Sequence, residues 1–521
     1  MKSCECKRIS SGLNGCCTIG LVLAILTPHA TVLYAQDSKV PNATDQIQAL
    51  KTAMATTQAQ LEQSQRQLDS MRQQLSALEK QLGPSAATSS NQSKKPIHTA
   101  SEKGDAQDLA TAVDEIREQQ SMQATQIATH DQTKVETESR YPVKVTGLLV
   151  LNGFVNTRAV DVPATPSVSL FGPGNTGATV RQTIIGFDAR GPHLAGAESY
   201  ADLRVDFDGT PQPGSSTYST NATFLRLRTA HAGLQWKHTC ASFSLDRPIF
   251  NPDAPTSLTA VALPALAWSG NLWTWNPQLG AEQDIPLSAT RKLQLQAAVI
   301  DVGQAPMTPT ISYANTLGSA PTSGEASRWP GLDAHVALLG STVRETANRI
   351  GIGGHVAPLH DPTGRRFTSW SATADAHLVL PGGLSASANA YRGLALGGLG
   401  GGTYKDFTYY IEPGPGTSYY FRPLSDVGGW AELKEEFNQR LELNAAVGLD
   451  NAFAGELRPY AVSGGNYYLN LARNRTATGN VILKPSAYLL FSLEYRRIQS
   501  YSVLDRQWSS DVIGLAAGFK F

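Results

Sequence analysis

The sequence contains few cysteines, no net charge and no long hydrophobic run. Only 5 of its 521 residues are Cys, and Lys+Arg equal Asp+Glu at 43 each. A disulfide-rich secreted scaffold would have dense cysteine, and a nucleic-acid-binding protein would have a basic excess. Beyond the amino-terminal region, no segment approaches the roughly 18 to 20 consecutive apolar residues of a membrane-spanning helix. These absences leave a soluble β-rich protein or a barrel that hides its apolar surface in alternating residues.

The first 35 residues have the pattern of a secretory signal peptide. Lys2, Lys7 and Arg8 form a basic start, an apolar run covers residues 18–26, and Ala35 is a small residue before the expected cleavage site. Four of the five cysteines lie in this segment, so the processed chain would keep only Cys240 and form no internal disulfide. Processing removes three basic residues and one acidic residue and leaves 40 against 42, a balance that predicts no nucleic-acid partner.

Residues 43–83 contain a hydrophobic repeat of 3.5 residues, which predicts a coiled coil because such a repeat keeps one seam facing a partner helix. The run stops at Gly83-Pro84, where proline disfavours helix. A single amphipathic helix on a core is the alternative, but the apolar stripe is too narrow for it. Residues 84–140 are expected to be a linker with a weak helical pattern. The repeat positions are Ile47, Leu50, Met54, Thr57, Leu61, Ser64, Leu68, Met71, Leu75, Leu78 and Leu82.

From residue 141 onward the hydrophobic period changes to two. Leu203 and Val205 alternate with charged residues, and Ile513, Leu515 and Phe519 share one face of the last segment. Alternation alone fits a half-buried soluble sheet or a lipid-facing barrel wall. The expected strands are 145–158, 178–190, 198–208, 222–236, 240–246, 272–284, 291–303, 329–341, 349–356, 367–380, 384–396, 428–438, 440–450, 472–484, 488–499 and 508–521.

The connections between these sixteen segments alternate between short and mostly long. Short turns on one rim and long loops on the other are typical of outer-membrane barrels, and an even strand number lets every strand pair. Residues 141–521 are therefore expected to form an all-β transmembrane barrel of about sixteen antiparallel strands, preceded by the α-helical coiled coil.

Four motifs stand out in the β-rich part of the chain. They are Gly186-Phe187-Asp188-Ala189-Arg190-Gly191-Pro192, residues 201–207, Asn271-Leu272-Trp273 opening the sixth strand, and Gly518-Phe519-Lys520-Phe521. Together with the coiled coil, these motifs resemble the outer-membrane porins of the DcaP-like branch over residues 43–521. The resemblance implies a homotrimer in the outer membrane, with the coiled coil in the periplasm. A terminal aromatic on an amphipathic strand is similar to the signal read by the barrel-insertion machinery, which implies recognition of Phe521.

Charged residues opposite the apolar wall face, with one from a long connection, are the candidate pore-lining residues. Cross-strand pairing that only satisfies buried charge is the alternative interpretation. Both can hold, because a paired charged wall is itself a filter for solutes. The candidates are Asp202, Arg204, Asp206, Asp208, Arg226, Arg228, Arg247, Glu494 and Arg496.

Two long connections and a set of aromatics carry further expectations. Residues 247–271 are rich in proline and apolar residues, which predicts that they fold inward and narrow the channel, as the corresponding loop does in general porins. The glycine-rich residues 397–402 lack a phosphate-binding spacing and are expected in an external loop. Six aromatic residues near strand ends are expected either to form girdles at the membrane interfaces or to pack in a core. They are Trp236, Trp273, Trp275, Trp430, Tyr488 and Trp508.

No enzymatic motif, metal-ligand set or cofactor motif is recognisable, so no cofactor is expected and the protein is not expected to be an enzyme. The favoured hypothesis is an outer-membrane porin, a passive diffusion channel for small hydrophilic solutes, with surrounding outer-membrane lipid. Its narrower form is a preference for anions such as dicarboxylates. The alternatives are a structural or adhesive outer-membrane barrel with a plugged lumen, and a secreted carbohydrate-binding β-sandwich.

Overall fold

The computed structural model describes residues 142–209, 224–308, 321–341, 347–412, 418–462, 467–504 and 507–521. The expected signal peptide (1–35), coiled coil (43–83) and linker (84–140) lie outside the described residues, and they stay predictions. Within the described part of the chain, no helix has the length and apolar character needed to cross a bilayer.

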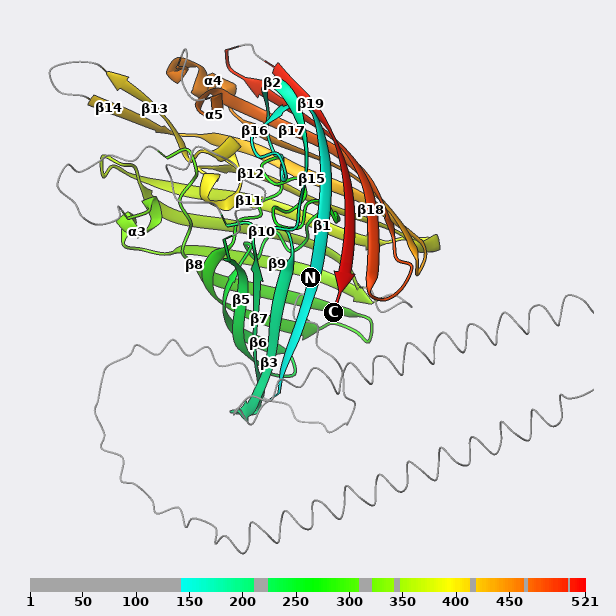
Figure 1. Cartoon of the computed structure of the whole chain (residues 1–521). Coiled ribbons are helices and arrows are strands. Elements are labelled where there is room, and N and C mark those ends of the chain that lie inside the picture. Colours follow the sequence, from blue (N-terminus) through cyan, green and yellow to red (C-terminus); the bar gives the residue numbers. More distant parts are fainter. Residues whose placement is uncertain are drawn as a thin grey trace, which may run out of the picture. The chain divides into compact units, whose positions relative to one another are not determined.

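Sixteen antiparallel strands form a closed ring (Figure 1), which confirms the predicted barrel. β1 pairs with β3 through its first half and with β19 through its middle, so every strand of the ring has two neighbours. The ring consists of β1 (Val143–Val160), β3 (Ile184–Leu194), β4 (Ala197–Asp206), β5 (Arg226–Gln235), β6 (Thr239–Asp246), β7 (Asn276–Pro286), β8 (Arg291–Ile300), β9 (Gly331–Ser341), β10 (Ala347–His360), β11 (Arg366–Val379), β12 (Leu384–Leu394), β15 (Ser425–Asn438), β16 (Leu441–Ala452), β17 (Leu471–Leu483), β18 (Leu489–Ser502) and β19 (Gln507–Lys520).

Each predicted strand corresponds to one strand of the ring, but some boundaries differ. The second begins at Ile184 and not at 178, and the third ends at Asp206 and not at 208. The sixth begins at Asn276, so Asn271-Leu272-Trp273 precedes it. Three strands outside the ring were not expected: β2 (Ser169–Thr179), which pairs with the second half of β1, and the hairpin of β13 (Phe407–Glu412) and β14 (Ser418–Pro423). Short helices α3 (Ser323–Ser327), α4 (Ala454–Leu457) and α5 (Tyr467–Asn470) lie in connections.

The two faces of the wall differ in polarity. In β18, Leu493 and Tyr495 are 54% and 49% exposed on the outside, whereas Glu494 and Arg496 between them are 2% and 7% exposed on the inside. An apolar outer face and a polar inner face reverse the pattern of a soluble protein and match a wall surrounded by hydrocarbon. The closed ring also excludes the β-sandwich, which has two separate sheets.

The main apolar core lies inside the barrel and not between sheets. Phe250, Leu272 and Leu396 come from connections and pack against the wall residues Ile300 and Leu359. These connections start at the rim with the longer loops, which include residues 161–183, 247–275, 395–424 and 453–470. On that rim, however, the connections 361–365 and 503–506 are short. The opposite rim holds both barrel termini, where Gly147 and Phe521 exchange backbone hydrogen bonds of 2.9 and 3.1 Å.

A charge placed on the outer face tests this arrangement. Ile352, in the middle of β10, is 65% exposed. We expect Ile352→Arg to lower the free energy of unfolding in lipid vesicles by about 2–4 kcal/mol, because arginine at the bilayer midplane must leave water. Urea titration measures the change, with Leu504→Arg in the turn between β18 and β19 as the control. Equal effects of the two substitutions would contradict a lipid-facing wall.

Candidate functional site

Residues 247–275, which we call the inward loop, cross the barrel interior. On the side of β5, Arg228 Nη1 donates to Val261 O at 2.6 Å and Arg226 Nη2 donates to Ala262 O at 2.8 Å. On the side of β15, Thr256 N donates to Glu432 Oε1 at 2.6 Å. β5 and β15 are the fourth and twelfth strands of the ring, on opposite sides of the barrel. The predicted inward folding is therefore confirmed.

One buried glutamine forms hydrogen bonds with several backbone groups at the tip of the inward loop. Gln182, just before β3, accepts hydrogen bonds from Val261 N and Ala262 N at 2.7 and 3.1 Å. Its amide donates to Thr259 O at 2.9 Å, an oxygen that also accepts from Asn152 Nδ2 of β1 at 2.9 Å. Buried backbone groups need such partners. Nothing in the sequence marks Gln182 for this role, because these partners in the inward loop lie 77 to 80 residues away along the chain.

Residues 395–406, which we call the glycine-rich loop, also fold inward, so the expectation of an external loop was wrong. Gly402 N and Thr403 N donate to Asp426 Oδ2 and Asp450 Oδ2 at 2.7 and 2.8 Å. Gly400 has φ +99°, and a Cβ there would lie 3.0 Å from the backbone nitrogen of Trp273. The glycines thus permit close packing against the inward loop.

A buried lysine fastens the glycine-rich loop to the segment before β17. Lys405 Nζ donates to Tyr468 O at 2.7 Å, to Leu471 O at 2.9 Å and to Thr403 O at 2.8 Å. Burial lowers the pKa of Lys405 to about 7, although Asp450 and Asp426 oppose this shift. The ammonium group of Lys405 therefore links the glycine-rich loop to the start of β17 through backbone carbonyls. This link adds to those that the inward loop makes with β5 and β15.

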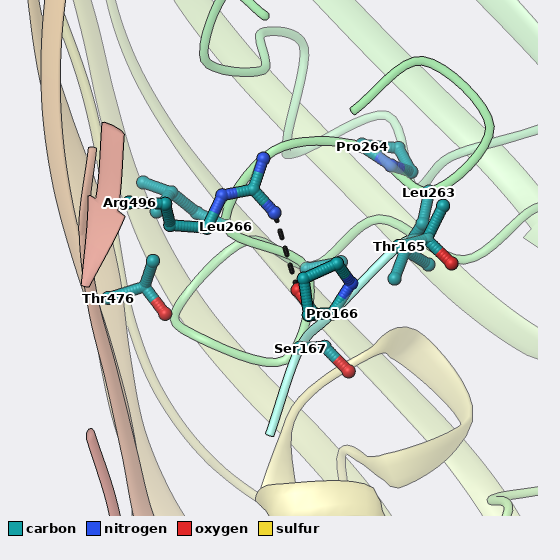
Figure 2. A pocket seen from close by; sticks show the side chains of 9 residues that line it. Thr165, Pro166, Ser167, Leu263, Pro264, Leu266, Thr476 and Arg496 are labelled. Carbon is teal, nitrogen blue, oxygen red and sulfur yellow. Dashed lines mark hydrogen bonds between the residues drawn. The ribbon is translucent and has the colours of Figure 1, made fainter. Parts of the chain in front are cut away.

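The loops and the wall leave little space where they meet. A cavity of about 10 Å³ lies between the connection after β1, the inward loop and the wall. Figure 2 shows the side chains that line it. A cavity of that size holds about one water molecule. Arg496 Nη1 points to Pro166 O at 3.3 Å, while its Nη2 donates to Glu494 Oε1 at 2.5 Å. This part of the interior is filled.

Four of the predicted charged residues lie beneath the loops. Asp206 is fully buried and accepts from Arg226 Nε and Nη2 at 3.0 and 2.7 Å, with Arg228 at 3.5 Å. Arg228 holds the inward loop, and Glu494 accepts from Ser257 Oγ of that loop at 2.5 Å. Asp206, Arg228, Glu494 and Arg496 are therefore anchors for the loops.

Three predicted residues keep contact with water. Asp202, Arg204 and Arg226 have side chains that are 26%, 30% and 27% exposed. Asp202 contacts His231 Nδ1 at 3.0 Å, and the other ring nitrogen of this histidine contacts Asp246 at 3.0 Å. Arg204 pairs with Asp188 at 2.5 Å.

The remaining two candidates lie outside the strands. Asp208 follows the end of β4 and lies 3.4 Å from Arg181. Arg247 opens the inward loop, where burial lowers its pKa and the charges of Asp246 and Asp253 oppose this. Neither residue belongs to the row formed by Asp202, Arg204 and Asp206 on β4.

Sequence reasoning missed a second charged cluster on β9 to β11. Arg349 Nε contacts Asp375 Oδ2 at 3.0 Å, and Asp375 Oδ1 contacts His335 Nε2 at 2.7 Å. Arg349 also pairs with Asp253 of the inward loop, whose side chain is 31% exposed. The sequence contains a signal for this cluster, because Asp333 and His335 on β9 alternate with apolar residues.

For three of the aromatic residues, the alternative of packing in the interior holds. Trp275 lies inside, 5.1 Å and 5.0 Å beneath the guanidinium groups of Arg226 and Arg228, Trp273 packs edge-on against Trp268, and Trp430 is buried. Among the described residues, no three or more His, Cys, Asp or Glu side chains are grouped to hold a metal ion.

The fold was compared with known proteins. No family model and no curated protein matches the chain. The crystal structure of the outer membrane channel DcaP of Acinetobacter baumannii matches with a TM-score of 0.53 and 15% identity, over 75% of this chain and 100% of that chain. Weaker matches include an anion-selective porin from Comamonas acidovorans (TM-score 0.42, 9% identity, 73% of this chain and 100% of that one) and OprB of Pseudomonas putida (TM-score 0.43, 12% identity, 72% and 94%). The chain therefore shares the barrel fold of the DcaP channel.

Removing the Gln182 carboxamide tests how the inward loop is held. We expect Gln182→Met to lower the free energy of unfolding by about 1–3 kcal/mol, since it leaves buried backbone groups without partners. Gln304→Met is the matched control, because Gln304 also bonds a backbone N–H but is exposed, and we expect about 0.5 kcal/mol or less there. Urea titration in vesicles measures both, and equal losses would argue against the anchoring role.

Proposed function

We propose that the protein is an outer-membrane porin through which small hydrophilic solutes diffuse. The observation that carries the proposal is the presence of partly exposed charged side chains inside a wall whose outer face is apolar. Asp202, Arg226 and Asp253 keep 26%, 27% and 31% of their side-chain surface exposed in the interior. Their contact with solvent supports a hydrated path beside the loops. The fold shared with an outer membrane channel supports the same conclusion.

The proposed path runs between two charged walls. Arg204, Arg226 and Asp202 lie on β4 and β5, and Arg349 with Asp253 lies towards β10. The inward loop narrows the space between them, and the opposed charges act on a passing solute through their field. Partly exposed residues of both signs line the proposed path. The narrower form of the proposal is a preference for anions such as dicarboxylates.

The proposal extends to the assembly. We include a homotrimer with an amino-terminal coiled coil in the periplasm and insertion through recognition of Phe521. The backbone of Phe521 pairs with Gly147 of β1 at the rim where the barrel begins and ends. Because Phe521 directly follows β19, where the ring closes, it is well placed for recognition by insertion machinery.

A barrel with a plugged lumen is the second candidate function. The packing of the loops favours it, because they leave a cavity of only about 10 Å³ at one contact with the wall. The buried Lys405 fastens the glycine-rich loop in the same way. This candidate describes a structural or adhesive barrel and predicts no ion flow.

Planar-bilayer recording of the purified full-length protein separates the two candidates. We expect a steady ohmic current in KCl. Under a KCl gradient, Asp253→Asn should shift the reversal potential towards anion permeation and Lys434→Gln towards cation permeation, because each removes a partly exposed inward charge. Asp301→Asn in the connection after β8 is the control and should change neither quantity. Absence of current would support the plug, and unchanged reversal potentials would remove these charges from the path.

A further inference from the structure

Three arginines point outward from the barrel on two neighbouring strands. Arg473 and Arg475 lie on β17 and Arg497 lies on β18, all on the exposed face of the wall. Arg473 Nε donates to Asn451 Oδ1 at 2.7 Å. Arg475 Nε and Nη2 donate to Gln499 Oε1 at 3.1 and 2.7 Å. These acceptors are neutral, so they orient the two guanidinium groups without cancelling their charge.

One acid neutralises part of this surface. Asp511 Oδ1 of β19 lies 3.1 Å from Arg497 Nη1 and accepts from the hydroxyl of Tyr495 at 2.7 Å. Within the described part of the chain, Arg473 and Arg475 form no ion pair. We call Arg473, Arg475, Arg497 and their partners Asn451, Gln499 and Asp511 the arginine patch. Three positive charges against one negative charge leave it with an excess of two.

The strand register places the arginine patch directly beyond the apolar belt. Arg497 is paired with Ala477 and with Asp511. The next outward position along β18 is Tyr495, followed by Leu493, with Val481 and Leu515 paired beside it. Each such step moves about 6.7 Å along a strand. The guanidinium groups therefore lie where hydrocarbon ends, on the side of the rim with the longer loops.

An apolar hollow extends over β12 and β15 to β18. Its nearest outward residues lie one step from Arg497 along β18, at Tyr495, and two steps from Arg475 along β17, at Gly479. It has a volume of about 490 Å³. Ala445 of β16 and Gly479 of β17 have small side chains or none, so the outer surface is depressed between their larger neighbours. The outward side chains around it are Leu384, Leu433, Leu443, Val481, Leu493 and Tyr495, with Glu435 at the edge towards the short-turn rim.

We infer that this face of the barrel binds a phosphorylated membrane lipid. The phosphate would lie on the arginine patch, because guanidinium groups match phosphate oxygens in charge and geometry. An acyl chain would fill the apolar hollow beneath. Charge complementarity above and apolar shape below together select a lipid over a free anion, which has no apolar part. The inference depends on the barrel lying in a bilayer and not on conduction through it.

Lipid binding by the delipidated full-length protein in nonionic detergent tests this inference. The probes are dimyristoylphosphatidic acid, dimyristoylphosphatidylcholine and dihexanoylphosphatidic acid, and native mass spectrometry measures the bound lipid. We expect dimyristoylphosphatidic acid to bind more tightly than either of the others. Arg475→Gln should weaken its binding about tenfold, the equivalent of one charge-assisted hydrogen bond. Arg190→Gln is the control, because Arg190 is exposed on β3 and paired with Glu198 at 3.1 Å.

A second variant tests the hollow independently of charge. In Gly479→Leu the new Cβ would have Asn444 O at 3.8 Å as its nearest neighbour, so the barrel accepts the side chain. We expect this variant to bind dimyristoylphosphatidic acid no better than the dihexanoyl form. Three results would overturn the inference: equal binding of phosphatidic acid and phosphatidylcholine, unchanged binding by both variants, or displacement of the lipid by inorganic phosphate. Crosslinking of two copies through Gly479→Cys would also overturn it, because a second chain would then cover the hollow.

Discussion

The structure depends on the need of every backbone N–H and C=O to find a partner where water is absent. A closed sheet meets this need, and here β1 closes it by pairing with β3 along one part and with β19 along another. In a closed sheet the number of strands sets the width of the interior. Closure also forces the alternation of apolar and polar residues, because each strand has one face towards hydrocarbon and one towards the interior.

The same requirement governs what fills the interior. A loop that enters the barrel brings backbone groups that need partners. The wall supplies them through Glu432 and Asn480, and the connection before β3 supplies them through Gln182. Charged wall residues divide accordingly. Asp206 and Arg228 are covered because the inward loop rests on them, whereas Asp202, on the same face of the same strand, keeps its contact with water. Anchoring and lining are thus two roles of one row of side chains.

The ring could be predicted from the sequence because alternation records which face each residue occupies. Leu493 and Glu494 show their faces without any structure, and prolines with apolar residues in 247–271 indicate a packed loop. The position of the glycine-rich loop was predicted wrongly, because glycine suits an external loop and a close backbone contact equally well. Gln182 and His231 could not be found, since their partners are set by the fold and not by neighbours in sequence. β2 could not be predicted either, because it contains glycines and a proline and lacks a clear alternation of apolar and polar residues.

Amide hydrogen exchange of residues 256–262, with the protein in lipid bilayers, tests the central claim most directly. We expect slow exchange at Thr256, Val261 and Ala262, whose N–H groups are held by Glu432 and Gln182 inside the barrel. The amides should exchange only when the loop leaves its anchors. Exchange as fast as in an unstructured peptide would contradict an inward loop fixed between opposite walls.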